Sequence, residues 1–250
     1  MGQIKLSVIL PSFNESENLK TGVLDKVEDY LKNLKINYEV IIVDDGSKDK
    51  TIEIINESIK NKKNFRLIEN SHNGKAITVM TGMMEAKGEI VLFADMDQAT
   101  PIDQIAKFFP RFEEGADIVI GSRTGRKGAP FFRKLTAWGF SVLRNLILGL
   151  PLKDTQCGFK AFNQKAVQLI FPKLLKSWEN MKTKGGGVNA GFDIEVLFIA
   201  KSKDLEIAEV DVEWHYVGTE RVQVIKDSID AIKDMLRIRV NSLLGRYNNY

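Results

Sequence analysis

The segment Glu89-Ile-Val-Leu-Phe-Ala-Asp-Met-Asp97 joins a short apolar run to two aspartates. An apolar run without polar alternation is typical of a strand buried on both faces of a parallel sheet. Runs of the same kind occupy residues 6–10, 39–43, 65–68 and 117–120. Amphipathic stretches lie between them, so the sequence predicts an α/β fold with a mostly parallel sheet flanked by helices.

Helices are expected where apolar residues recur at steps of three and four. The first half predicts them at 19–34, 48–62, 75–87 and 101–113. The second half predicts helices at 131–150, 164–175, 192–202 and from 222 onward, with strands at 157–162 and 206–214. The glycine-rich segment 176–190 is expected to be a loop that serves as a lid or a tether. We expect one domain, 1–250, made of a regular half (1–123), a less regular half (124–221) and an amphipathic C-terminal helix (222–250).

Composition narrows the class of protein. Of the 250 residues, 44% are hydrophobic and 28% are charged, and the net charge is +3, which is typical of an ordered globular chain. The longest apolar stretch, 146–152, is far below the roughly 18 residues of a membrane span. No signal segment is expected before the first strand. The single cysteine, Cys157, rules out an internal disulfide and fits a cytoplasmic setting.

Residues that follow each strand are the candidate site, because ligands of open α/β sheets bind at the carboxyl ends of the strands. The first strand is followed by Pro11-Ser-Phe-Asn-Glu15. Asn14, with Glu17 three residues later, fits a capping box at a helix start. This interpretation leaves Pro11, Phe13 and Glu15 to face a ligand.

Two acidic pairs follow the second and fourth strands. Asp44 and Asp45 either accept hydrogen bonds from the base and ribose of a nucleotide or lie in a solvated turn. Asp95 and Asp97 are two residues apart in an expected extended segment, so their carboxylates should point the same way and could share Mg²⁺ or Mn²⁺. A lone Asp-x-Asp is also found in ordinary acidic turns.

Two nucleotide-binding motifs are absent. The first strand is not followed by Gly-x-Gly-x-x-Gly, which argues against a dinucleotide dehydrogenase, and Gly74-Lys75 lacks the flanking residues of a P-loop. A diphosphate would have to be held otherwise. A metal on Asp97, with Lys75 and Arg123 as neighbouring cations, would do so.

The chain resembles the family 2 glycosyltransferases of the GT-A fold, and within them the dolichyl-phosphate glucosyltransferases and polyprenyl-phosphate mannose synthases. The resemblance extends over nearly the whole chain. It is carried by Val8-Ile-Leu-Pro-Ser-Phe-Asn-Glu15, Val43-Asp-Asp-Gly-Ser47, Gly74-Lys75, Gly82-Met83, Gly88-Glu89, Asp95-Met-Asp97, Gly121-Ser-Arg123 and Asp154-Thr-Gln-Cys-Gly-Phe-Lys160. The last of these, with Phe192-Asp-Ile-Glu195 and Val212-Glu-Trp-His215, is similar to the glucosyltransferase branch in particular.

The resemblance implies an inverting hexosyltransferase that uses Mg²⁺ or Mn²⁺, a nucleotide sugar such as UDP-glucose, and a polyprenyl or dolichyl phosphate acceptor. Residues 1–123 would bind the donor and 124–221 the acceptor. The implied donor residues are Pro11, Phe13, Glu15, Asp44, Asp45, Lys75, Asp95, Met96 and Asp97, with Asp95 and Asp97 on the metal. The implied acceptor residues are Arg123, Arg133, Asp154, Gln156 and Lys160, and Asp97, Arg123 and Arg133 would be catalytic.

Some positions depart from the family pattern. Ala76 and Ile77 stand where the glucosyltransferases have glycines. Ala99 stands where the mannose synthases often have a metal-binding glutamine, and Gln98 comes one residue earlier. The known glucosyltransferases also carry an N-terminal membrane anchor, and none is expected here.

Basic residues are concentrated between Ile118 and Lys153, where seven of them, Arg144 among them, occur without an acidic residue. Arg237, Arg239 and Arg246 continue this pattern near the C-terminus. The pattern fits either a solvated basic face or, as we expect, peripheral attachment to the cytoplasmic face of a membrane. Nucleic acid is not an expected partner, because no recognition motif accompanies the charge.

Three other functions remain open. A family 2 enzyme could act on a hydroxyl of a glycan or glycolipid, which requires a general base. A mannose synthase would use GDP-mannose. A nucleotide- or lipid-binding module of the same fold would bind without turnover.

Overall fold

The computed structural model describes residues 2–123, 131–180, 191–215 and 224–248, and only the backbone for 131–138, 180 and 224–228. A seven-stranded sheet runs through it in the order β3-β2-β1-β4-β6-β5-β7. The strands are β1 (Leu6–Ser12), β2 (Tyr38–Asp44), β3 (Phe65–Glu69), β4 (Ile90–Ala94), β5 (Ile118–Ser122), β6 (Phe159–Asn163) and β7 (Ile207–Asp211). The α/β fold with a mostly parallel sheet is confirmed.

Strand β6 runs antiparallel to both of its neighbours, β4 and β5, whereas the other pairs are parallel. In the register, Phe159 lies opposite Ala94 and Lys160 opposite Ile120. The start of β6 therefore meets the ends of β4 and β5. This reversal brings the loop before β6 to the edge of the sheet that carries the candidate site.

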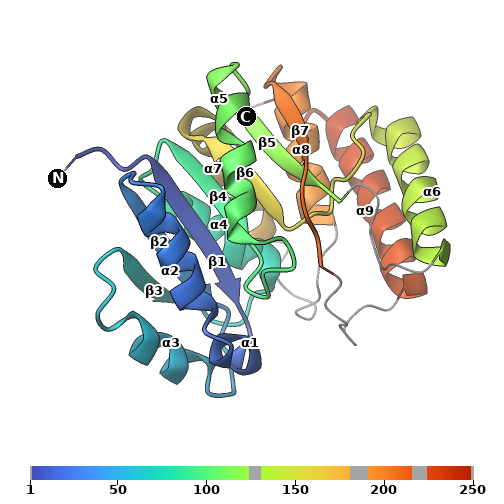
Figure 1. Ribbon diagram of the computed structural model, residues 1–250. Coiled ribbons are helices and arrows are strands. Elements are labelled where there is room, and N and C mark those ends of the chain that lie inside the picture. Colours follow the sequence, from blue (N-terminus) through green and yellow to red (C-terminus); the bar gives the residue numbers. More distant parts are fainter. Residues whose placement is uncertain (1, 124–130, 181–190, 216–223, 249–250) are drawn as a thin grey trace.

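Helices cover both faces of the sheet, and Figure 1 shows the layers. One face packs against α4 (Lys75–Glu85), α7 (Gln164–Asn180) and α8 (Gly191–Ser202). The other packs against α2 (Val23–Asn33), α3 (Thr51–Ile59) and the 3₁₀ turn η1 (Ile102–Lys107). Residues along a strand alternate between the two cores, as Ile9 and Leu10 do, which explains why the strands are apolar throughout.

Three expected elements have different limits. The predicted helix 19–34 is two helices, α1 (Ser16–Lys20) and α2, because Gly22 between them has a left-handed φ of 74°. The predicted helix 101–113 is η1 followed by the short α5 (Phe109–Glu113). The predicted loop 176–190 starts later, because α7 continues to Asn180. Residues 181–190 lie outside the described chain.

The capping box at Asn14 is wrong. Asn14 has a left-handed φ of 53°, and its side chain accepts a hydrogen bond from the Lys48 backbone N–H instead of capping a helix. Helix α1 begins at Ser16 without a side-chain cap. The Asn14 side chain thus joins the loops after β1 and β2.

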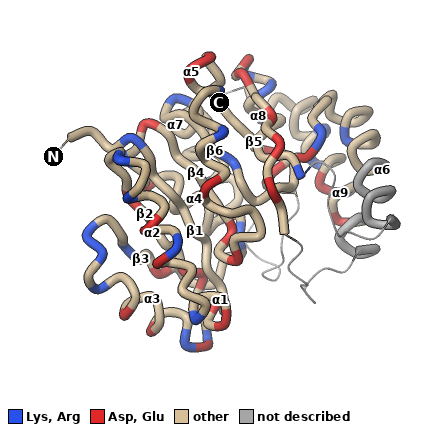
Figure 2. Tube along the Cα trace, in the orientation of Figure 1, with Lys and Arg blue, Asp and Glu red and all other residues tan. Residues whose placement is uncertain are grey.

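Helices α6 (Phe131–Leu148) and α9 (Val224–Leu243) pack against each other beside the last strands of the sheet (Figure 1). Charged residues of both signs are distributed over the helices and loops (Figure 2). In the described chain, no helix combines the length and the apolar character that a membrane crossing requires.

Candidate active site

The loops after β1 and β2 form one hydrogen-bonded unit at the carboxyl edge of the sheet. The Asn14 N–H donates to Ser47 Oγ at 2.8 Å, and the Glu15 N–H donates to Thr51 Oγ1 at 2.8 Å. Pro11 and Phe13 lie half-buried at the same edge. The Phe13 ring stacks on His72 with 4.4 Å between centroids. His72 was not among the predicted site residues, and the structure places its ring on a predicted donor residue.

Asp44 and Asp45 are both buried, and each holds a loop. Asp44 accepts hydrogen bonds from the N–H and the hydroxyl of Ser47, at 2.8 and 2.5 Å. Asp45 accepts the N–H groups of Asn73 and Gly74, at 2.8 and 2.9 Å. The solvated-turn alternative is therefore wrong for this pair. Their contact with a base or ribose remains a prediction, and their shown role is to shape the edge.

Asp95 and Asp97 lie in a turn just beyond β4, not in the extended segment that was expected. The Gln98 N–H donates to the Asp95 carbonyl at 3.1 Å, and Gln98 has a left-handed φ of 50°. Asp97 Oδ1 accepts the Ala99 N–H at 3.0 Å. Met96 between them is buried. The two carboxylates are therefore positioned by this turn rather than by the alternation of a strand.

Lys75, the first residue of α4, reaches the acidic turn. Its ammonium lies 2.5 Å from Asp95 Oδ1. Burial alone would lower the pKa of Lys75, but the charges of Asp95, Asp193 and Asp97 outweigh this effect and raise the pKa. Lys75 therefore stays cationic under the charges of three carboxylates, of which Asp95 is in direct contact with it. One of them, Asp193, comes from α8 and was not among the predicted site residues.

Gly158 fits closely against Asp95. The Asp95 N–H donates to the Gly158 carbonyl at 3.1 Å. A Cβ at Gly158 would overlap Asp95 Oδ2 and would lie 2.8 Å from Asp95 Oδ1. Only glycine leaves room for this carboxylate, which gives the Cys-Gly-Phe part of the motif a physical reason.

Arg123 and Asp154 form a two-pronged ion pair. Arg123 Nε and Nη2 donate to the two Asp154 oxygens at 2.6 and 2.8 Å. The Arg123 guanidinium also lies 5.8 Å from the centroid of the Trp214 ring. Burial acts to lower the pKa of Arg123, but Asp154 outweighs it and the pKa is raised. A fixed cation of this kind suits a phosphate ligand.

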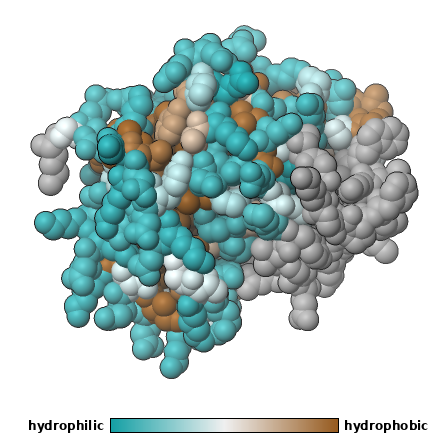
Figure 3. Space-filling view, in the orientation of Figure 1, coloured by the Kyte–Doolittle hydropathy of each residue, from teal (hydrophilic) through white to brown (hydrophobic). Residues whose placement is uncertain are grey.

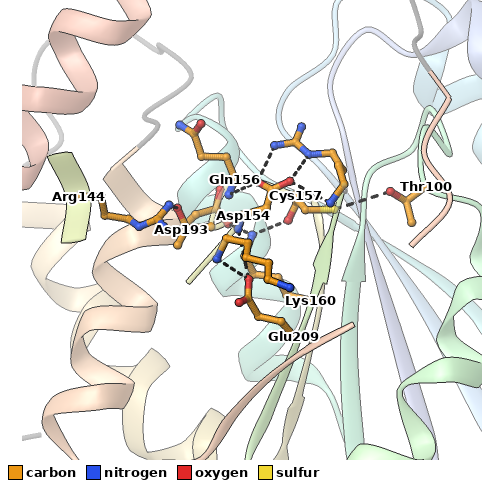
Figure 4. Close-up of polar contacts among 11 residues, drawn as sticks. Thr100, Arg144, Asp154, Gln156, Cys157, Lys160, Asp193 and Glu209 are labelled. Carbon is orange, nitrogen blue, oxygen red and sulfur yellow. Dashed lines mark hydrogen bonds and ion pairs between the residues drawn. The ribbon is translucent and has the colours of Figure 1, made fainter. Parts of the chain in front are cut away.

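The Asp154 loop is held from several sides, as Figure 4 shows. Glu209 on β7 accepts the N–H groups of Lys153 and Asp154, at 2.7 and 3.2 Å. The Gln156 N–H donates to Asp154 Oδ1 at 3.1 Å. Cys157 is buried next to Thr100.

Lys160 is 1% exposed and anchors β6 to α8. Its ammonium lies 2.6 Å from Asp193 Oδ1 and 5.2 Å from the centroid of the Phe93 ring. Lys160 therefore positions Asp193, while its predicted contact with an acceptor remains a prediction. The predicted contact of Gln156 with an acceptor also remains a prediction.

Two basic residues of the segment 118–153 differ in what the structure describes of them. Arg144 is 1% exposed, and its guanidinium donates to Thr155 Oγ1 at 3.0 Å, to Ser141 Oγ at 2.9 Å and to the Leu152 carbonyl. Its assignment to a basic surface is wrong, because these acceptors hold it inside the protein. The Arg133 side chain lies outside the described residues, so its predicted role in acceptor binding stays a prediction.

The side chains that could bind the predicted metal are few. Among the side chains that the structure describes, no three His, Cys, Asp or Glu residues gather as a metal site. Two carboxylates, Asp95 and Asp97, stand at one turn. Mg²⁺ is commonly bound by one or two carboxylates together with substrate phosphates and water, so this donor set fits such an ion once a diphosphate is present.

The residues that sequence reasoning missed lie far along the chain from the acidic turn. Asp193 was contained in Phe192-Asp-Ile-Glu195, a segment that carried the resemblance, and this was the signal that could have found it. Gly158 was likewise contained in a quoted motif without a role. The direction of β6 brings Gly158 to the site, and the position of α8 brings Asp193 there; neither could be inferred from the sequence.

Comparison with known sequences finds similarity to glycosyltransferases. The model of the family described as Glycosyl transferase family 2 matches residues 7–171. The chain is 33% identical to a dolichyl-phosphate beta-glucosyltransferase of Dictyostelium discoideum, over 97% of this chain and 76% of that protein.

Two solved structures share the fold. The mannosyl-3-phosphoglycerate synthase from Rubrobacter xylanophilus has a TM-score of 0.71 at 17% identity, covering 97% of this chain and 75% of that one. The glucosyl-3-phosphoglycerate synthase from Mycobacterium tuberculosis, in complex with Mn²⁺, UDP-glucose and phosphoglyceric acid, has a TM-score of 0.63 at 20% identity, covering 95% and 80%. These likenesses confirm the predicted GT-A fold.

Proposed function

Because this chain belongs to glycosyl transferase family 2, we propose that it transfers glucose from UDP-glucose to the phosphate of dolichyl phosphate or another polyprenyl phosphate. One observation carries the proposal: the similarity to a dolichyl-phosphate beta-glucosyltransferase extends over 97% of the chain. The geometry supports it, because an acidic turn and a fixed arginine lie at the same edge of the sheet. The reaction inverts the anomeric carbon.

The donor belongs at the edge formed by β1, β2 and β4. Phe13 and the loops held by Asp44 and Asp45 would hold the uridine, and the Asp95–Asp97 turn would face the diphosphate. A divalent cation, bound by Asp97 and Asp95, would neutralise charge on the diphosphate. The Lys75 ammonium can move from Asp95 to a phosphate oxygen, because it is at the end of a long, flexible side chain. Lys75 is also the first residue of α4, and a helix N-terminus favours a bound phosphate.

The acceptor belongs next to Arg123. An oxygen of the lipid phosphate attacks the anomeric carbon, the new C–O bond forms, and the bond to the UDP oxygen breaks with its electron pair leaving on UDP. A phosphate monoester has a second pKa near ~6, so the attacking oxygen is already ionised and needs no strong base. The work of the protein is to hold two anions together. Asp154 serves this purpose by fixing the Arg123 guanidinium.

Two alternatives concern the substrates. GDP-mannose would replace UDP-glucose if the donor pocket favours guanine. A hydroxyl acceptor would need a base, and Asp193 is a carboxylate at the site, although its ion pair with the buried Lys160 engages one of its oxygens. A third alternative, binding without turnover, is tested by product formation.

The experiment offers the purified protein a panel of nucleotide sugars with Mg²⁺ and a polyprenyl phosphate, then identifies the products by mass spectrometry. Conversion of UDP-glucose in preference to GDP-mannose is expected. Transfer to a glycolipid alcohol offered in a parallel reaction, with none to the lipid phosphate, would favour the hydroxyl acceptor. UDP binding without any product would favour the module and contradict the proposal. We propose that the reaction takes place at a membrane surface, since the proposed acceptor is a lipid. We propose the cytoplasmic face because a chain with a single cysteine fits a reducing compartment.

A further inference from the structure

Exposed apolar side chains are concentrated on two neighbouring helices. In the part of the chain with described side chains, nine large hydrophobic residues are exposed, and eight of them lie on α6, on α9 or directly after α9. The most exposed are Leu146, at 78%, and Leu243, at 74%. The ninth, Met84, is on α4. In contrast, the face of the first half that Figure 3 shows is mostly hydrophilic, with smaller apolar patches.

Helix α9 has two apolar faces. Ala231, Met235 and Ile238 are buried against the core. Among the residues of α9 whose side chains are described, the other large apolar ones are exposed and recur at steps of three and four, which puts them on a separate outer face. They are Ile229, Ile232, Leu236, Val240 and Leu243. On α6, Val142 and Leu146 are exposed in the same way, one turn apart.

These residues form exposed apolar outer faces on both helices. On α6 the inward positions include Arg144, whose guanidinium is satisfied by carbonyl and hydroxyl groups. Helix α6 thus buries an arginine and exposes a leucine, the reverse of the usual distribution for a helix whose outer side faces water. Concentrated apolar exposure of this kind marks a surface that meets a protein or a membrane.

We propose that the outer faces of α6 and α9 dock onto the surface of an anionic lipid bilayer. Lys233 and Arg239 are exposed and, by helical spacing, lie on opposite sides of the α9 stripe. Arg246, just beyond the helix, is also exposed. Cations that flank an apolar stripe are the arrangement that binds negatively charged headgroups while the stripe enters the interface.

A second copy of the chain fits this face less well. A two-fold symmetric dimer places the same patch of both subunits in contact. The flanking cations Lys233 and Arg239 would then face a patch that carries the same charges, and like charges across an interface are unfavourable. The only exposed acidic residue described on α9, Asp230, already pairs with Lys233 at 3.1 Å.

The docking face is joined to the site. Glu195 on α8 is buried and accepts hydrogen bonds from Arg237 on α9, at 3.1 Å, and from the Tyr247 hydroxyl, at 2.6 Å. Asp193, two residues earlier on α8, lies at the site. This inference rests on the proposed function in one respect: a lipid-borne acceptor would be presented to the Arg123 side by a bilayer held at these helices.

The test measures co-sedimentation of the protein with vesicles that contain no polyprenyl phosphate. A triple variant, Leu236→Gln, Val240→Gln and Leu243→Gln, changes only exposed side chains and keeps good helix formers. Binding to vesicles with about 30% anionic lipid should fall at least about tenfold. The matched control, Met84→Gln, changes an exposed apolar residue on another helix and should bind as the wild type does. High salt should weaken wild-type binding.

A transfer assay and a measurement of oligomeric state complete the test. Transfer to a short, water-soluble polyprenyl phosphate should be unchanged in the triple variant, which also shows that it folds. Vesicle binding by the triple variant at the wild-type level would overturn the inference. So would a wild-type dimer in lipid-free solution that the triple variant converts to monomer, because the face would then belong to a second copy. Since the vesicles lack acceptor, the binding result is independent of whether the proposed transfer occurs.

Discussion

Gly158 and Asp95 lie so close that the carboxylate of Asp95 occupies the space a side chain at position 158 would need. The variant Gly158→Ala should therefore turn this carboxylate away from its present position while the sheet around it stays intact. A displacement of about 1 Å at a reacting centre can cost about 100-fold in rate, and we expect a loss of kcat/KM of this order. Steady-state kinetics measure the loss, and circular dichroism checks the fold.

The control for this variant is Gly139→Ala. A Cβ at Gly139 would meet no atom within 4 Å, and the position is helical, so alanine should be tolerated or slightly stabilising. If Gly158→Ala kept wild-type kcat/KM, the close fit would have no role in positioning Asp95.

The ion pair between Arg123 and Asp154 should matter for both stability and acceptor use. Asp154→Asn leaves a largely buried guanidinium without its carboxylate, which should cost about 3 kcal/mol in the free energy of unfolding. The KM for polyprenyl phosphate should rise about tenfold or more, while the KM for the donor changes little. Denaturant titrations and kinetics with each substrate varied in turn provide the measurement.

An exposed pair serves as the comparison. Arg111 and Glu114 lie 2.7 Å apart on the surface, and Glu114→Gln should change stability by about 0–1 kcal/mol. Equal effects of the two substitutions on stability, or an unchanged acceptor KM in Asp154→Asn, would count against the assigned role of Asp154.

Asp97→Ala should abolish transfer without unfolding the protein. Loss of a ligand to a cation that neutralises the leaving diphosphate should lower kcat by about 1000-fold, which corresponds to about 4 kcal/mol. A chelator should have a similar effect on the wild type, and added Mg²⁺ should reverse it. Asp25→Ala, at an exposed position on α2, is the control. Turnover by Asp97→Ala at the wild-type rate would refute the metal assignment.

Asp117 should make the stability of the fold depend on acidic pH. Burial acts to raise the pKa of Asp117, but hydrogen bonds from the Asn163 side chain and the Glu206 N–H outweigh it, and the pKa is lowered. A carboxyl with a lowered folded-state pKa stabilises the fold above its unfolded pKa of about 3.9 and loses this contribution as the pH falls through the folded value.

The Tm of Asp117→Asn should therefore be below that of the wild type at about pH 7, and the difference should shrink as the pH falls below about 4. The exposed Glu113→Gln is the control. A difference between Asp117→Asn and wild type that stays constant from neutral to strongly acidic pH would contradict this assignment.

The first half of the sheet was readable from the sequence because strands buried on both faces are apolar throughout. The five runs predicted from it correspond to β1 to β5. Acidic residues after β2 and β4 were found for the same reason, since the ends of parallel strands form one edge. The turn at Asp95–Asp97 was not foreseen, because strand alternation does not extend past the last ladder residue.

The second half was less readable because its contacts join distant segments. The antiparallel direction of β6, which brings Gly158 to Asp95, leaves no mark on the local pattern. Nor does local sequence show that Arg144 points inward, because two of its acceptors, Thr155 and the Leu152 carbonyl, come from the loop after α6. The apolar periodicity of α9 did not show which residues face outward, because the helix also buries Ala231, Met235 and Ile238 against the core.

The most direct test of the central claim is the structure of the lipid product. The wild-type protein is incubated with Mg²⁺, a polyprenyl phosphate and UDP-glucose labelled in the sugar, and the product is analysed by mass spectrometry and by NMR of the anomeric proton. We predict one glucose joined through its anomeric carbon to the lipid phosphate, in the β configuration, and no such product with Asp97→Ala. An α-linked product, a sugar attached elsewhere than on the phosphate, or no glycolipid at all would contradict the account.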